Sequence, residues 1–91
     1  MKGEISMINK DEAYSIMQKY IEDNIPDQHI YLMRDFEDAY FFVVCDKGKT
    51  SKDYDCLINC FYIVHKNNGE VVQDDFYICG KPLGKLLVLN E

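Results

Sequence analysis

Apolar residues near the start of the chain recur at spacings of three and four. This period places them on one face of an α-helix, with charged residues on the opposite face. Asn9 is a suitable N-cap, and Glu12 three residues later completes the pattern of a capping box. Pro26 disfavours helical geometry in the residue before it, so we predict that the helix ends at about Asn24. The predicted buried face consists of Ala13, Ile16, Met17, Tyr20 and Ile21.

Beyond the helix the pattern changes to that of β-strands. Residues His29 to Phe36 alternate weakly between the two faces of a strand. Residues Ala39 to Cys45 form a continuous apolar run, which is typical of a central strand covered on both faces. The intervening Glu37 and Asp38 favour a turn.

A β-hairpin is predicted in the second half of the chain. The longest strand runs from Cys56 to Lys66, and Glu70 to Asp74 pairs back onto it. Between them stand two asparagines and Gly69, and Asn-Gly is the sequence that a type I′ turn prefers. Two further segments are apolar: Phe76 to Cys79 is a candidate strand, and Leu86 to Leu89 is a short strand or a docked tail.

One helix followed by antiparallel strands predicts an α+β fold. We expect a single domain over residues 1–91, with one N-terminal helix packed on an antiparallel sheet of three to five strands. Seven tyrosines and five phenylalanines are more than one helix can cover on one side of such a sheet. Either the tail after Gly80 or a binding partner should therefore cover the second face.

The balance of charge restricts the class of partner. Sixteen carboxylates against ten lysines and arginines give a net charge of -6. This charge disfavours nucleic acid and anionic membranes as partners. It suits a basic protein partner, although solubility alone also explains it. No apolar run has the length of a signal peptide or of a membrane span, so we expect a cytoplasmic protein with reduced thiols.

The cysteines and histidines do not suggest a metal site or an enzyme. The intervals between Cys45, Cys56, Cys60 and Cys79 contain ten, three and eighteen residues, and none has the two-residue spacing of a zinc site. The two histidines, His29 and His65, belong to separate strands. A Cys45–His65 pair across strands is conceivable, but no electropositive flank favours a thiolate. We expect no metal, no cofactor and no catalysis.

Acidic residues gather at turns and in the loop from Asp46 to Asp55. They are either solvated turn residues or the rim of a protein-binding surface. The loop is longer than most hairpin connections, which fits either a tolerated insertion or a functional loop, and its Tyr54 is a residue type that anchors interfaces. The candidate partner-binding residues are Asp35, Glu37, Asp38, Tyr40, Asp53, Tyr54 and Asp55.

The hairpin residues Val64 to Val71 read Val-His-Lys-Asn-Asn-Gly-Glu-Val. They resemble the hairpin of the YrhB-like immunity proteins of bacterial polymorphic-toxin systems, whose pattern is Val-Asn-Lys-x-Thr-Gly-Glu-Val. His65 and Asn68 depart from that pattern, whereas the order of a helix followed by strands is similar. The resemblance implies a protein that neutralises a toxin by binding it, and it supplies no functional residues to carry over.

Two functional hypotheses follow. The first is a cytoplasmic immunity or antitoxin-like protein that binds a cognate, basic toxin domain without catalysis. The alternative is a regulatory or phage-encoded sheet module of unknown ligand that forms homo-oligomers, such as a homodimer.

Overall fold

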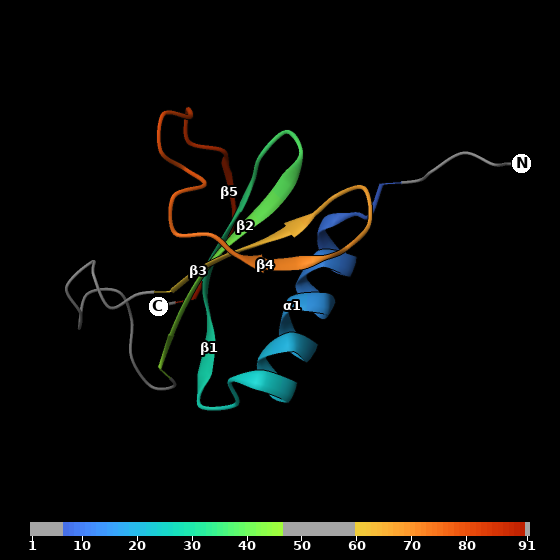
Figure 1. Ribbon diagram of the computed structural model, residues 1–91, viewed down its shortest axis with the longest axis vertical. Coiled ribbons are helices and arrows are strands. Elements are labelled where there is room, and N and C mark those ends of the chain that lie inside the picture. Colours follow the sequence, from blue (N-terminus) through green and yellow to red (C-terminus); the bar gives the residue numbers. More distant parts are fainter. Residues whose placement is uncertain (1–6, 47–59, 91) are drawn as a thin grey trace, which may run out of the picture.

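The computed structural model describes residues 7–46 and 60–90, which form one helix and one antiparallel sheet (Figure 1). The sheet has five strands in the order β4-β3-β2-β1-β5. This arrangement confirms the predicted α+β fold with an N-terminal helix packed on the sheet. The elements are α1 (Lys10–Asn24), β1 (Gln28–Asp35), β2 (Ala39–Asp46), β3 (Cys60–His65), β4 (Val71–Gln73) and β5 (Lys85–Leu89).

Helix α1 begins and ends where the sequence predicts. The Asn9 side chain accepts a hydrogen bond from the Glu12 N–H at 2.8 Å, and the Glu12 carboxylate accepts one from the Asn9 N–H at 3.0 Å. These two bonds satisfy amide groups that the first turn of a helix leaves unpaired. The buried positions of the helix are Ala13, Met17 and Ile21, while Ile16 and Tyr20 are half-buried.

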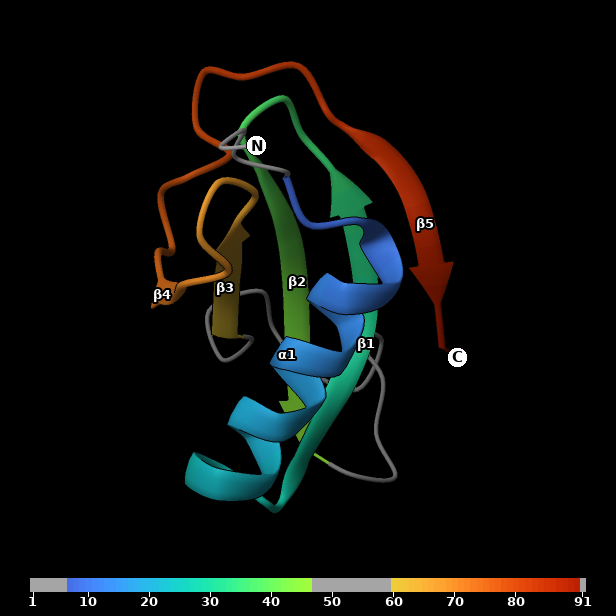
Figure 2. The same cartoon turned by 90° about the vertical axis from the view of Figure 1, so that its right-hand side faces the viewer.

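Strand β2 is the central strand of the sheet, as its continuous apolar run predicts. Seven of its eight residues are buried. Phe42 and Val44 face the helix and join the core beneath it, whereas Phe41 and Val43 face the opposite side of the sheet. Figure 2 shows α1 lying in front of β1 and β2, with β5 at the outer edge.

The chain between β4 and β5 packs on part of the second face of the sheet. We call residues 74–84 the β4–β5 connection; it runs between strands at opposite edges of the sheet, on the side away from α1 (Figure 1). Its Tyr77 is buried against Phe36 and Phe41, with ring centroids 5.3 and 6.4 Å away. The sequence left this cover to either the tail after Gly80 or a partner; the residue that packs here, Tyr77, lies before Gly80.

The predicted strand at Phe76–Cys79 is wrong, because this stretch forms consecutive turns. The Asp74 carboxylate accepts a hydrogen bond from the Phe76 N–H at 3.1 Å, and the Cys79 N–H donates to the Phe76 carbonyl at 3.0 Å. An aspartate that bonds the backbone two residues ahead stabilises a turn in place of a strand. The other candidate segment, near the end of the chain, does form a strand, β5.

The β3–β4 turn lies where it was predicted but is wider than a two-residue type I′ turn. The last paired residues are His65 and Glu70, so the loop contains the four residues Lys66 to Gly69. The Gly69 N–H donates to the His65 carbonyl at 2.8 Å, and Gly69 has a φ of 73°. Gly69 therefore supplies the left-handed conformation that returns the chain to β4.

Candidate interaction site

Lys66 joins two turns at one end of the sheet. Its N–H donates to the Asp38 carbonyl at 3.0 Å, which ties the β3–β4 turn to the β1–β2 turn. Its ammonium lies 2.6 Å from an Asp35 carboxylate oxygen and 4.7 Å from the centre of the Tyr40 ring. The Lys66 side chain is only 14% exposed, so this ion pair is shielded from water more than most surface pairs. Lys66 thereby fixes the backbone that carries the acidic residues predicted to bind a partner.

The β4–β5 connection is attached to the same end of the sheet through Asp38. The Tyr77 hydroxyl donates a hydrogen bond to the Asp38 carboxylate, which holds the pKa of that carboxyl below its usual value of 3.8. Burial and the same hydrogen bond raise the pKa of the Tyr77 phenol, so Tyr77 stays protonated and remains a donor. The Lys81 ammonium lies 3.3 Å from the centre of the Tyr77 ring, a cation–π contact.

A pocket of about 470 Å³ opens between the β1–β2 turn and the β4–β5 connection. Its walls combine carboxylates, aromatic rings and one ammonium group, so it can recognise both charge and apolar surface. Glu37 is exposed at its rim and makes no hydrogen bond or ion pair with the residues that the structure describes. The lining residues that matter most are Asp35, Glu37, Asp38, Tyr77, Lys81 and Leu83.

The structure brings together three of the predicted partner-binding residues, Asp35, Glu37 and Asp38. Tyr40 does not belong to this surface, because its side chain is 7% exposed and packs in the core beneath the helix. Its place within the apolar run of β2, on the face toward the helix, explains this burial. Asp53, Tyr54 and Asp55 lie outside the described residues, and their roles stay predictions.

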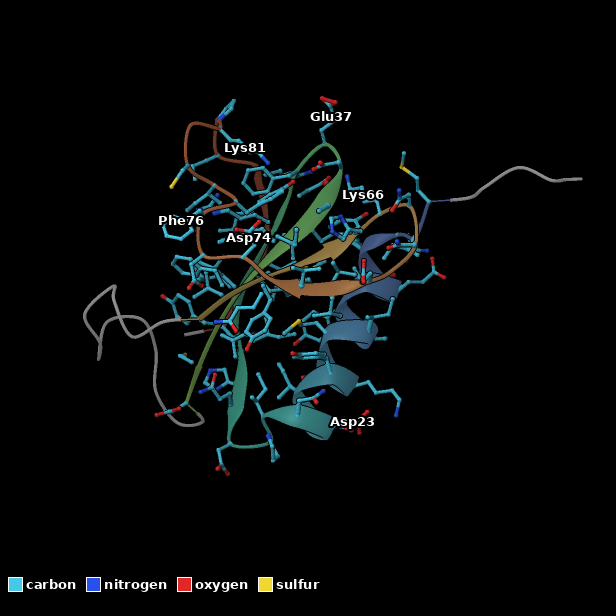
Figure 3. The ribbon with its side chains drawn as sticks, viewed as in Figure 1. Asp23, Glu37, Lys66, Asp74, Phe76 and Lys81 are labelled. Atoms are coloured by element: carbon cyan, nitrogen blue, oxygen red, sulfur yellow. The ribbon has the colours of Figure 1, made fainter. Side chains whose placement is uncertain are left out.

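Sequence reasoning missed the exposed apolar residues of the β4–β5 connection. Phe76 is 78% exposed and Leu83 is 68% exposed. Figure 3 shows Phe76 pointing outward from this connection near Asp74, whereas Glu37 and Lys81 lie further up, toward the β1–β2 turn. The available signal was the pair Asp74-Asp75, because an Asp side chain that bonds the backbone two residues ahead favours a turn.

We also considered a cysteine–histidine pair and a metal site. Cys45 lies opposite His29, with its sulfur 3.7 Å from Nε2, so the histidine beside it is not His65 as considered above. Within residues 7–46 and 60–90, no three His, Cys, Asp or Glu side chains are placed to hold a metal ion.

Within that part of the chain, no helix has both the length and the apolar character needed to cross a membrane. No family model, curated protein or solved structure matches this chain.

Proposed function

We propose that this protein binds a basic protein partner, and that the partner is a bacterial toxin domain which it neutralises without catalysis. The observation that carries the proposal is the combination of exposed apolar and acidic side chains on the β1–β2 turn and the β4–β5 connection. We call this set, Glu37, Asp38, Phe76, Lys81 and Leu83, the turn surface. Large apolar side chains exposed within a charged rim are typical of protein-binding surfaces.

The scaffold beneath the turn surface supports this proposal. Glu37 and Asp38 stand on a turn that Lys66 fixes to the neighbouring hairpin through its backbone. Phe76 precedes Tyr77, which is buried and bonded to Asp38. A surface whose backbone is held in this way loses little conformational entropy when it binds, which increases affinity.

Charge supports a basic partner. The net charge of -6 attracts positively charged proteins at long range, and the carboxylates of the turn surface then act at short range. The toxin class comes from the likeness of the Val64–Val71 hairpin to that of YrhB-like immunity proteins. In this proposal the acidic residues speed encounter, and Phe76 and Leu83 keep the complex together.

Co-expression tests the proposal. The product of the adjacent gene is expressed with this protein carrying an affinity tag, and growth and co-purification are recorded. We expect the adjacent product to arrest growth alone, to be harmless with this protein, and to co-purify in a fixed ratio. A toxin that still arrests growth, or an adjacent product that does not co-purify, would contradict the proposal.

A second candidate is self-association through β5. This strand lies at the outer edge of the sheet beside β1, and its Leu86 and Leu89 are exposed. An edge strand can pair with the same strand of a second copy. Light scattering over a range of concentrations tests this candidate: a dimer that Leu86→Lys dissociates supports it, and a monomer at all concentrations excludes it.

A further inference from the structure

The pocket between the β1–β2 turn and the β4–β5 connection already holds one cation. The Lys81 ammonium sits over the ring of Tyr77 at 3.3 Å from its centre. The same pocket is lined by the carboxylates of Asp35, Glu37 and Asp38. A cation that rests on an aromatic face beside carboxylates has the two kinds of partner that guanidinium groups prefer.

Tyr77 has one face toward the core and the other toward Lys81. On the core side its ring stacks on Phe41, with an angle of 15° between the two planes. Lys81 is an exposed residue on the β4–β5 connection, and its ammonium makes no ion pair with the residues in the described ranges. The contact between Lys81 and Tyr77 is thus a weak one that another cation can replace.

Two of the carboxylates retain unused hydrogen-bonding capacity. One Asp38 oxygen accepts the Tyr77 hydroxyl, and a carboxylate can accept several further bonds. Glu37 is exposed and unpaired among the described residues. Asp35 is already paired with Lys66, so it is not counted among the groups that bind a second cation.

We propose that this pocket receives an arginine side chain of the partner, which replaces Lys81 on the face of Tyr77 and pairs with Glu37 and Asp38. A planar guanidinium stacks on an aromatic ring and bonds carboxylates in two directions at once, whereas the ammonium of Lys81 makes only a cation–π contact with the ring. This inference rests on the proposed function for the identity of the partner. The pocket itself can be tested without the partner.

The probe is N-acetyl-L-arginine amide, added to the ¹⁵N-labelled full-length protein and followed by two-dimensional NMR. We expect shifts confined to amides around the pocket, including those of Glu37, Lys81 and Gly84. N-acetyl-L-citrulline amide has nearly the same shape without the charge and should cause no such shifts. Equal shifts with both compounds, or shifts spread over other parts of the protein, would overturn the proposal.

Two variants test the displacement of Lys81. Lys81→Ala removes the competing cation, so it should bind the arginine probe about threefold more tightly or better. Lys81→Met keeps an apolar chain on the ring and removes only the charge, which provides a second variant if the first does not fold. Glu37→Gln should weaken binding by about threefold, because it removes one charge. Unchanged affinity in both Lys81 variants would overturn the displacement.

The outcome is separable from that of the proposed function. If the pocket binds the arginine probe but the protein neutralises no toxin, the arginine-binding pocket is supported and the toxin function is rejected. Toxin neutralisation without pocket binding keeps the function and rejects this pocket as the place where an arginine of the toxin binds.

Discussion

The ammonium of Lys66 lies 2.6 Å from the carboxylate of Asp35, and this pair joins the β3–β4 turn to the end of β1. The backbone of the same lysine bonds the Asp38 carbonyl, and its carbonyl accepts the Ile8 N–H at 2.9 Å. One residue therefore connects two turns and the segment that enters the helix. Its position explains how an acidic turn without regular structure is held in one place.

Replacing Lys66 with methionine should lower the free energy of unfolding by about 1–2 kcal/mol, because it leaves the partly buried Asp35 without its partner. Lys19→Met is the matched control, since Lys19 pairs with Asp23 at 3.4 Å on the exposed face of the helix. That control should cost less than about 0.5 kcal/mol. Urea denaturation measures both, and equal losses would show that the Lys66 pair has no special role.

Gly69→Ala should destabilise the fold by about 1–2 kcal/mol, because Gly69 has a φ of 73° and an added Cβ would lie 3.1 Å from the Ile16 side chain. Gly80→Ala is the control: its φ is 76°, but nothing lies within 4 Å of the added atom. The excess cost at Gly69 measures the contact with the helix. Thermal denaturation of both variants gives this difference, and a larger loss at Gly80 would contradict the account.

Tyr77→Phe should lower the free energy of unfolding at pH 7 by about 1 kcal/mol, since it removes a hydrogen bond to an exposed, solvent-screened carboxylate. The pKa of Asp38 is lower in the folded protein than its usual 3.8, chiefly because of this bond. The stabilisation is therefore complete above about pH 4 and is lost as the pH falls through the folded pKa of Asp38.

Urea denaturation of wild type and Tyr77→Phe at pH 7 and at pH 3 measures this dependence. We expect the difference in stability between the two proteins to be smaller at pH 3. In an Asp38→Asn background, Tyr77→Phe should have the same effect at both values of pH. A difference that grows as the pH falls would have the wrong sign for this hydrogen bond.

Phe76→Ala should leave stability unchanged within about 0.5 kcal/mol, because the side chain is 78% exposed. If Phe76 anchors the partner, the same change should speed dissociation of the complex by about tenfold or more. Leu89→Ala, on the exposed edge of β5, is the control and should not alter dissociation. Surface plasmon resonance measures both dissociation rates. Faster dissociation of Leu89→Ala but not of Phe76→Ala would indicate that the partner binds at β5 instead.

The sequence predicted the elements whose signal is local. The Asn9–Glu12 capping box and Pro26 bound the helix, and the apolar run at Ala39–Cys45 predicted the central strand. The turn at Phe76–Cys79 was missed because four apolar residues in a row also suit a strand. Only the hydrogen bond that the Phe76 N–H donates to the Asp74 carboxylate decides between the two.

The candidate site was only partly predictable. Acidic residues next to each other in sequence were recognised as one turn, but the lysine that fixes this turn comes from a hairpin 31 residues away. Tyr77 lies 39 residues from Asp38, so no local pattern shows their hydrogen bond. Such pairings depend on strand order, in which β4 and β5 lie at opposite edges. The burial of Tyr40 follows from the same packing.

The most direct test of the proposed binding surface is the rate at which the partner associates with two charge variants. Glu37→Lys and Asp23→Lys change the net charge equally, but Glu37 and Asp23 lie at opposite ends of the molecule (Figure 3). We predict that Glu37→Lys slows association with the toxin domain several-fold at about 0.05 M salt, and that the effect fades at about 0.5 M. Asp23→Lys should retain a rate close to that of the wild type. Equal slowing by both variants would mean that only net charge matters, and it would contradict a binding surface at the β1–β2 turn.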